Sequence, residues 1–203
     1  MTKPYSELRA EARAALSGKW MMAALVTLIY LAVCGGLSNI PYVGFLLVLL
    51  FGMPVAYGFM VLFLDVFRGT GAVELEKLFA GFKDYTRIMG TMVLMAVYTM
   101  LWSLLLIVPG VIKSYSYALT PFILKDDPQL KYDAAIEKSM RMMEGHKMKL
   151  FVLDLTFLGW ILLGIITCGL GLLWIEPYMV MAHAAFYETL KKEQVTEEPA
   201  VEV

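Results

Sequence analysis

The sequence predicts an all-α, polytopic membrane protein, with about six transmembrane helices as three hairpins and three amphipathic helices on the cytoplasmic side. Three observations predict this fold class. Hydrophobic residues make up 60% of the 203 residues, charged residues make up 17%, and the mean hydropathy is +0.69; a soluble domain has about 25% charged residues. Residues 20–64 and 88–112 contain no Asp, Glu, Lys, Arg or His. Almost all basic residues lie between the apolar segments.

The apolar segments set the expected spans. About 20 helical residues cross the hydrocarbon core of a bilayer, so an apolar, uncharged run of this length predicts a transmembrane helix. We expect a membrane domain over residues 20–190. Its spans are expected at residues 20–38, 44–67, 88–108, 111–124, 150–167 and 171–190. The fourth is short and begins at Pro109-Gly110, so a full span, a kinked continuation and a half-helix all remain open.

The basic residues set the expected orientation. Of the 17 Lys and Arg residues, all but Lys113 lie in the termini or in the longer loops, while the short turns near residues 38–41, 108–110 and 167–169 are uncharged. Short loops rich in Lys and Arg stay in the cytoplasm. Both termini are therefore expected inside. Glu7 and Glu11 argue against a cleavable signal peptide, and the sequence shows no basic patch that would favour nucleic acid as a partner.

Three segments outside the spans have the apolar spacing of an amphipathic helix, which predicts a helix resting on the bilayer surface or on the cytoplasmic ends of the spans. The first lies within a cytoplasmic segment, residues 1–19. Asp127-Pro128 is a suitable start for the third, because an acidic cap precedes a proline. Residues 191–203 are expected to form a disordered cytoplasmic tail. The apolar stripes are Tyr5, Leu8, Ala12 and Leu16; Leu75, Leu78, Phe79 and Phe82; and Tyr132, Ile136, Met140 and Met143.

A weak internal repeat is consistent with this order of elements. Each unit would contain an amphipathic helix, a Gly and a Lys near its end, and a helical hairpin with an uncharged turn. The Gly and Lys positions are Gly18-Lys19, Gly81-Phe82-Lys83 and Gly145-His146-Lys147. Parallel repeats of this kind occur in membrane proteins, although any hairpins that start inside share these features.

Several stretches resemble one known family. They are residues 9–20 (RAEARAALSGKW), residues 119–128 (LTPFILKDDP), Gly145-His146-Lys147, residues 153–160 (LDLTFLGW) and Pro177-Tyr178. This pattern resembles the bacterial integral membrane family known as domain of unknown function 975, over most of residues 5–190. The resemblance implies a protein of the bacterial cytoplasmic (inner) membrane. It implies no activity, substrate or catalytic residue.

Ionisable residues inside the predicted spans are the candidates for a functional site, because a charge in hydrocarbon costs several kcal/mol. Lys113 and Glu176 are expected at one depth in the outer half, where we predict that they pair. Asp154 and His183 are expected at one depth in the inner half, also in contact. For all four residues, an ordinary polar contact between helices is the alternative to a substrate or ion site. Tyr115 and Tyr117 complete the candidate site, either lining the cavity of Lys113 or anchoring the helix at the interface.

The sequence predicts no catalytic residue, no metal site and no cofactor. Cys34 and Cys168 match no metal-ligand spacing, and whether they pair is left open. His146 is expected at the membrane surface. Three functions remain open: a non-enzymatic protein that binds lipids or assembles with other envelope proteins, a small transporter or channel, and a membrane-embedded enzyme. Membrane lipids are the expected partners, together with other membrane proteins or a second copy of the chain.

Overall fold

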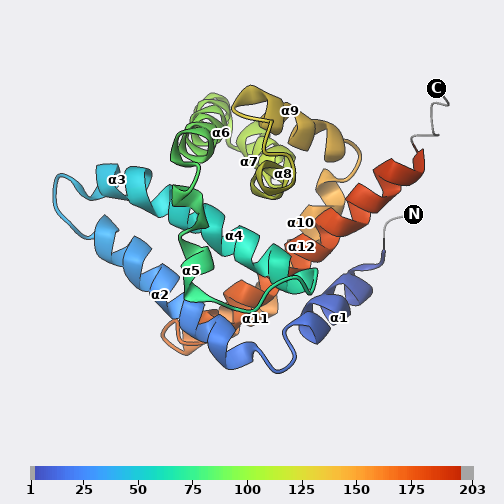
Figure 1. Ribbon diagram of the computed structural model, residues 1–203, viewed down its shortest axis with the longest axis horizontal. Helices are drawn as coiled ribbons and strands as arrows, with labels where there is room; N and C mark the ends of the chain where they lie inside the picture. The colour runs from blue at the N-terminus through green and yellow to red at the C-terminus, as the bar shows by residue number, and fades with distance from the viewer. Residues whose placement is uncertain (1–2, 198–203) are drawn as a thin grey trace.

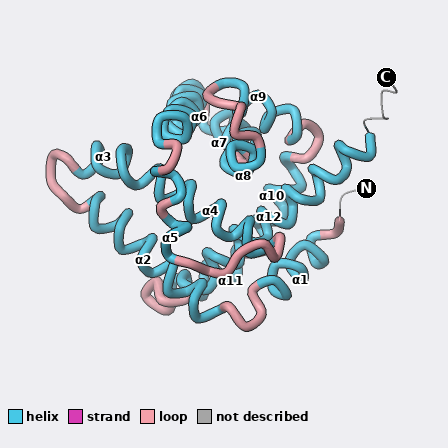
Figure 2. Tube along the Cα trace, in the orientation of Figure 1, coloured by secondary structure: helices cyan, strands magenta, loops and turns pink. Residues whose placement is uncertain are grey.

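The computed structural model describes residues 3–197, and in that range the chain forms helices and turns without strands (Figure 2). The first part contains α1 (Tyr5–Ala15), α2 (Trp20–Ser38), α3 (Gly44–Leu47), the π-helical turn η1 (Val48–Gly52), α4 (Met53–Phe67), α5 (Leu75–Leu78) and the 3₁₀ turn η2 (Ala80–Phe82). The second part contains α6 (Tyr85–Leu105), α7 (Ile107–Tyr117), α8 (Thr120–Asp126), α9 (Asp133–Met142), α10 (Lys147–Leu155), α11 (Leu158–Ile166) and α12 (Leu172–Glu197).

Five helical segments within the described residues are long and apolar enough to cross a membrane. They are Trp20–Ser38, Gly44–Phe67, Tyr85–Leu105, Ile107–Asp126 and Lys147–Ile166. These segments match the first five predicted spans to within a few residues. The fourth, at 20 residues, is longer than the sequence suggested, because α7 begins before Pro109 and α8 continues it past Thr120-Pro121. Proline near the start of α8 costs no helical hydrogen bond, because the first amides of a helix have no partner.

The sixth predicted span falls within α12, which is not among these five segments of the described chain. Glu176, His183 and Glu188 interrupt its apolar sequence. The helix lies inside the protein instead: Met181, Ala182 and Ala184 on successive faces are fully buried. Contacts with α1, α2, α4, α10 and α11 surround it. Helix α12 is therefore the hub on which the other helices pack.

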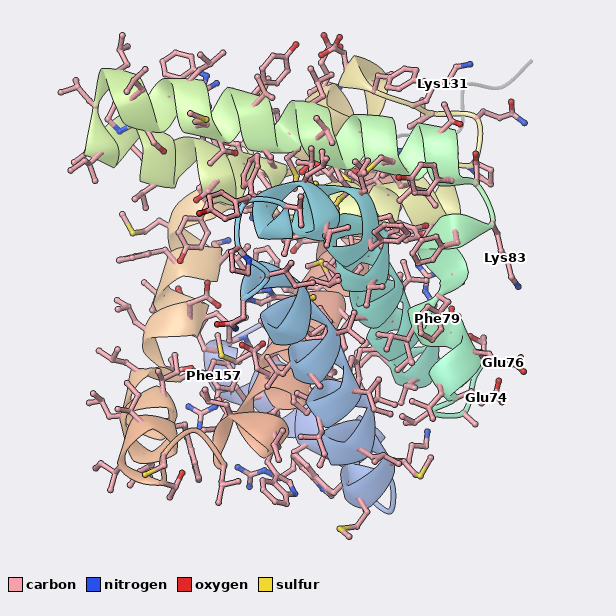
Figure 3. All side chains as sticks on the ribbon, turned by 90° about the vertical axis from the view of Figure 1, so that its left-hand side faces the viewer. Glu74, Glu76, Phe79, Lys83, Lys131 and Phe157 are labelled. Atoms are coloured by element: carbon pink, nitrogen blue, oxygen red, sulfur yellow. The ribbon has the colours of Figure 1, made fainter. Side chains whose placement is uncertain are left out.

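The hairpins do not lie parallel to one another. Figure 3 shows the α6–α7 hairpin running crosswise to α2 and to the α10–α11 segment. Leu104 and Ile107, at the tip of the α6–α7 hairpin, are 80% and 79% exposed. Six spans in three aligned hairpins are therefore not confirmed, although the helical class and the apolar segments are.

The first and third amphipathic segments bury most of their predicted apolar faces, whereas the second buries only part of its face. Leu8, Ala12 and Leu16 are buried, and α1 packs along the first part of α12 (Figure 1). The second segment breaks into α5 and η2, with Leu78 buried and Phe79 exposed. The third forms α9, which packs on α6, α7 and α8.

Helix α9 begins at Asp133, so the expected start at Asp127-Pro128 is wrong. The carboxylate of Asp127 forms an ion pair with Lys138 instead of capping a helix. Arg87 on α6 holds the intervening loop in place by donating hydrogen bonds to the carbonyl oxygens of Leu124 and Leu130, both at 3.1 Å.

The C-terminal helix extends further than the sequence suggested. Helix α12 continues through Glu197, into the segment predicted as a disordered tail. An ion pair between Lys191 and Asp126 fastens its end to α8. Residues 198–203 of the predicted tail lie outside the described residues.

Two of the three expected repeat units share a backbone feature. Gly18 and Gly145 both have a φ of 74°, the left-handed conformation that ends helices and that glycine adopts at low cost. Each follows an amphipathic helix and precedes a Lys at the start of an apolar one. Gly81 differs, because it packs directly against the backbone of Pro54.

Candidate functional site

The candidate polar site is built on one face of α12. Glu176 and His183 are seven residues apart, which is within about 20° of two full helical turns. Tyr187 lies one further turn along the same face. These polar residues give an otherwise buried helix a polar stripe along its length.

Asp154 and His183 are in direct contact, as the sequence predicted. The imidazole Nε2 of His183 lies 2.6 Å from Oδ1 of Asp154. The His183 side chain is 19% exposed and the Asp154 side chain is 22% exposed, so the hydrogen bond between them is largely shielded from solvent. The prediction came from their equal distances to the α11–α12 turn.

A tyrosine completes this group. The Tyr115 hydroxyl donates a hydrogen bond to Oδ2 of Asp154 at 3.0 Å, and its ring packs edge-on against Phe151 at 5.7 Å between centroids. The sequence placed Tyr115 beside Lys113; in the structure it joins Asp154 and His183. We call Tyr115, Asp154 and His183 the aspartate triad.

The aspartate triad borders an apolar groove. His183 and Tyr117 line a groove of about 590 Å³ between α4, α6, α7, α8 and α12. Its walls carry small and sulfur-containing side chains, which include Met60, Met92, Met95, Ala96, Met100 and Ala118. We call it the methionine groove. It presents a basic imidazole within an apolar lining, an arrangement suited to an apolar molecule with one polar group.

Lys113 and Glu176 do not pair, so this part of the predicted site is wrong. The ammonium of Lys113 lies 5.0 Å from the ring centroid of Trp102 and 4.0 Å from Sδ of Met140. Helix α7 packs on α6, α9 and α10, whereas the beginning of α12 lies against α11 and α2. The sequence predicted that Lys113 and Glu176 lie at the same depth in the membrane, but α7 and the beginning of α12 are not neighbours.

Glu176 is half-buried and forms no hydrogen bond or ion pair with any residue that the structure describes. Its electrostatic neighbours are His183 and Tyr30. Cys34 and Cys168 are both free thiols, so the disulfide that the sequence left open is not formed.

A second polar cluster fastens the ends of α4, α8 and α12. Arg68 donates two hydrogen bonds of 2.6 Å to the carboxylate of Asp126 and two more to Glu188, at 2.7 and 2.5 Å. Tyr187 and Lys191 also donate to Asp126, at 2.9 and 2.5 Å. The hydrogen bonds to Asp126 raise the pKa of the Arg68 guanidinium above its usual value.

The sequence did not single out this cluster. Asp65, three residues before Arg68, forms a separate ion pair with Lys125 at 2.9 Å. The one available signal was the position of Asp126 in the stretch 119–128 that supports the family resemblance. The partners come from three segments more than 50 residues apart, and nothing in the local pattern connects them.

The five apolar helical segments define a polytopic α-helical membrane protein. The chain belongs to the family described as Protein of unknown function (DUF975), whose model matches residues 1–119 and 104–194. No curated protein and no solved structure matches the chain.

Proposed function

We propose that this protein is a non-enzymatic membrane protein that binds a lipid chain in the methionine groove. The observation that carries this proposal is the groove itself, about 590 Å³ in volume, with its apolar walls and His183 at its border. Pockets for small ligands commonly have volumes of about 300–1,000 Å³. The groove has room for part of an acyl chain.

The composition of the groove supports a flexible apolar ligand. Methionine side chains are unbranched and polarisable, so they adapt to chains of different shape. Met100, on the wall of the groove, is 69% exposed, so the groove is continuous with the apolar outer surface. A lipid could enter from the side without crossing a polar barrier.

The polar edge would select the ligand's head. Asp154 orients His183 through Nε2, which leaves the other ring nitrogen for a ligand. A hydroxyl or phosphate group at that edge would gain a hydrogen bond. The proposal includes a bacterial cytoplasmic membrane, cytoplasmic termini, and partners among lipids and other membrane proteins, as the basic loops and the family resemblance suggest.

Filling the groove tests the proposal. Ala96 lines the groove, whereas the adjacent Val97 points outward and is 44% exposed. Native mass spectrometry of protein gently extracted from membranes would report the lipid that each variant retains. We expect A96W to retain less lipid than V97W, because only A96W fills the groove. Equal retention by the two variants would refute binding in the groove.

A small transporter is the second candidate function. The half-buried, unpaired carboxylate of Glu176 on the same face of α12 as His183 favours it, because carboxylate and histidine chains carry protons in transporters. Proteoliposomes with an internal pH dye and an imposed potential would measure proton flux. Flux that E176Q and H183N abolish would favour transport; flux no greater than in protein-free vesicles would exclude proton transport.

A further inference from the structure

Two arginines on α1 form a group separate from the aspartate triad. The guanidinium carbon of Arg9 lies 5.6 Å from the ring centroid of Phe157. That of Arg13, one turn along the helix, lies 5.9 Å from the ring centroid of Tyr178. Phe157, labelled in Figure 3, lies where α10 meets α11. The arginines thus join α1 to both arms of the last hairpin.

The position of both guanidinium groups is fixed by the protein. Leu8, Ala12 and Leu16, on the neighbouring face of α1, are buried and hold the helix against the protein. The Tyr178 hydroxyl donates a hydrogen bond of 3.2 Å to the carbonyl oxygen of Arg9. The Phe157 and Tyr178 rings pack edge-on at 5.0 Å between centroids, so the surface under both arginines is rigid.

Neither arginine has an acidic partner among residues 3–194, whose side chains the structure describes, in contrast to Arg68 and Arg87. The Nε atom of Arg9 is buried without a hydrogen-bond acceptor in that part of the chain. A ring face stabilises a cation without using its N–H donors. Two adjacent guanidinium groups therefore keep unused donors and two uncompensated positive charges, which is the recognition chemistry of a phosphate group.

The surroundings indicate that the phosphate belongs to a lipid. Trp20 packs edge-on against Tyr178 at 6.1 Å, and the apolar helix α2 begins at Trp20. Large apolar side chains are exposed directly beyond, with Met21 at 79% and Leu158 at 51%. Tryptophan, tyrosine and arginine at the start of apolar helices are typical of the headgroup region of a bilayer.

We infer that Arg9 and Arg13 bind the phosphate of an anionic membrane phospholipid, whose chains lie against the beginning of α2. This site is independent of the methionine groove. Tyr178 and His183 are five residues apart on α12, about 140° around the helix at about 100° per residue, so the two sites face different sides of the hub. Binding here would fasten α1 and the last hairpin to the same leaflet.

The test measures retained phosphatidylglycerol by native mass spectrometry of the full chain, taken from vesicles of phosphatidylcholine with a minor fraction of phosphatidylglycerol. We expect R9Q/R13Q to lower occupancy by about 10- to 30-fold, because each arginine near an anionic surface contributes about 1 kcal/mol. The matched control is K83Q/K131Q, which removes the same charge from two exposed lysines (Figure 3). It should change occupancy by about twofold or less, because exposed charges are screened.

Three further arms make the result decisive. R9K/R13K keeps the positive charge but loses the planar guanidinium donors, so it should retain less phosphatidylglycerol than the original chain. Its unfolding temperature should equal that of the original chain, so this variant tests the site even if R9Q/R13Q proves unstable. An equal loss in K83Q/K131Q would overturn the inference in favour of general surface charge. Full displacement by inorganic phosphate would overturn it in favour of a free anion. A96W should leave this lipid in place, so the two sites fail separately.

Discussion

Asp154 is a carboxylate at an unfavourable position for its charge. It lies in the last turn of α10, where the helix dipole disfavours a negative charge. The structure compensates with two partners on other helices, the His183 imidazole and the Tyr115 hydroxyl. A residue that is unfavourable in its own helix and is stabilised by side chains from other helices is typical of a functional position.

A double-mutant cycle between Asp154 and His183 tests their contact. We expect D154N and H183N each to lower the free energy of unfolding in detergent by about 1–2 kcal/mol, because a largely shielded hydrogen bond to a charged group is lost. The double variant should lose clearly less than the sum. Y115F, which removes one hydroxyl, is the control and should cost about 1 kcal/mol. Simple additivity of D154N and H183N would contradict the contact.

Lys113 and Glu176 should behave in the opposite way. Their side chains contact different helices, so the effects of K113M and E176Q on unfolding in detergent should add within about 0.5 kcal/mol. Thermal unfolding of the two single variants and the double variant would measure this. A coupling energy well above that limit would restore the ion pair that the sequence predicted and the structure lacks.

Among the helices, the closest packing is between α4 and the α5–η2 segment. Gly58 on α4 lies against the carbonyl of Leu78, and Gly81 lies against the carbonyl of Pro54. A Cβ atom at either glycine would overlap these backbone atoms. The two glycines allow the short amphipathic segment to pack on α4 without a gap.

Substitution of Gly58 by alanine should therefore destabilise the protein. We expect G58A to lower the free energy of unfolding by about 1–3 kcal/mol, because the added methyl group forces the α5 backbone away from α4. Gly35 in α2 is the control, since a Cβ atom there meets nothing within 4 Å. G35A should be neutral or stabilising by up to about 1 kcal/mol. Equal unfolding temperatures for G58A and the original chain would contradict this packing.

The sequence predicted the elements better than their arrangement. Uncharged runs located α2 and the α3–α4 segment, because exclusion of charge is a local property of a span. The contact of Asp154 with His183 was predictable because both lie in one hairpin, where distance from the turn sets the register. The predicted contact of Lys113 with Glu176 was wrong, and the contact of Arg68 with Asp126 was missed. Both depend on which hairpins are neighbours, and apolar composition alone does not determine the order of the hairpins.

At the scale of the whole molecule, almost all Lys and Arg residues lie in the termini and the longer loops, and this pattern sets the orientation that we expect. We expect a single cysteine at position 39, in a background without Cys34 and Cys168, to react with a membrane-impermeant reagent added outside intact cells. A cysteine at position 138 should react only after the cells are opened. Excess Lys and Arg on the side of Lys138 is the physical reason. Labelling at position 138 and not at 39 would reverse the orientation.

The hub of the fold is made long after the first helices that pack on it. Helices α1, α2 and α4 leave the ribosome more than 100 residues before α12, which buries their inner faces. At about 5–20 residues per second, these faces wait for several seconds without their final partner. The core therefore closes only after α12 has been made, and a chain truncated before Leu172 would leave the inner faces of α1, α2 and α4 without their packing partner.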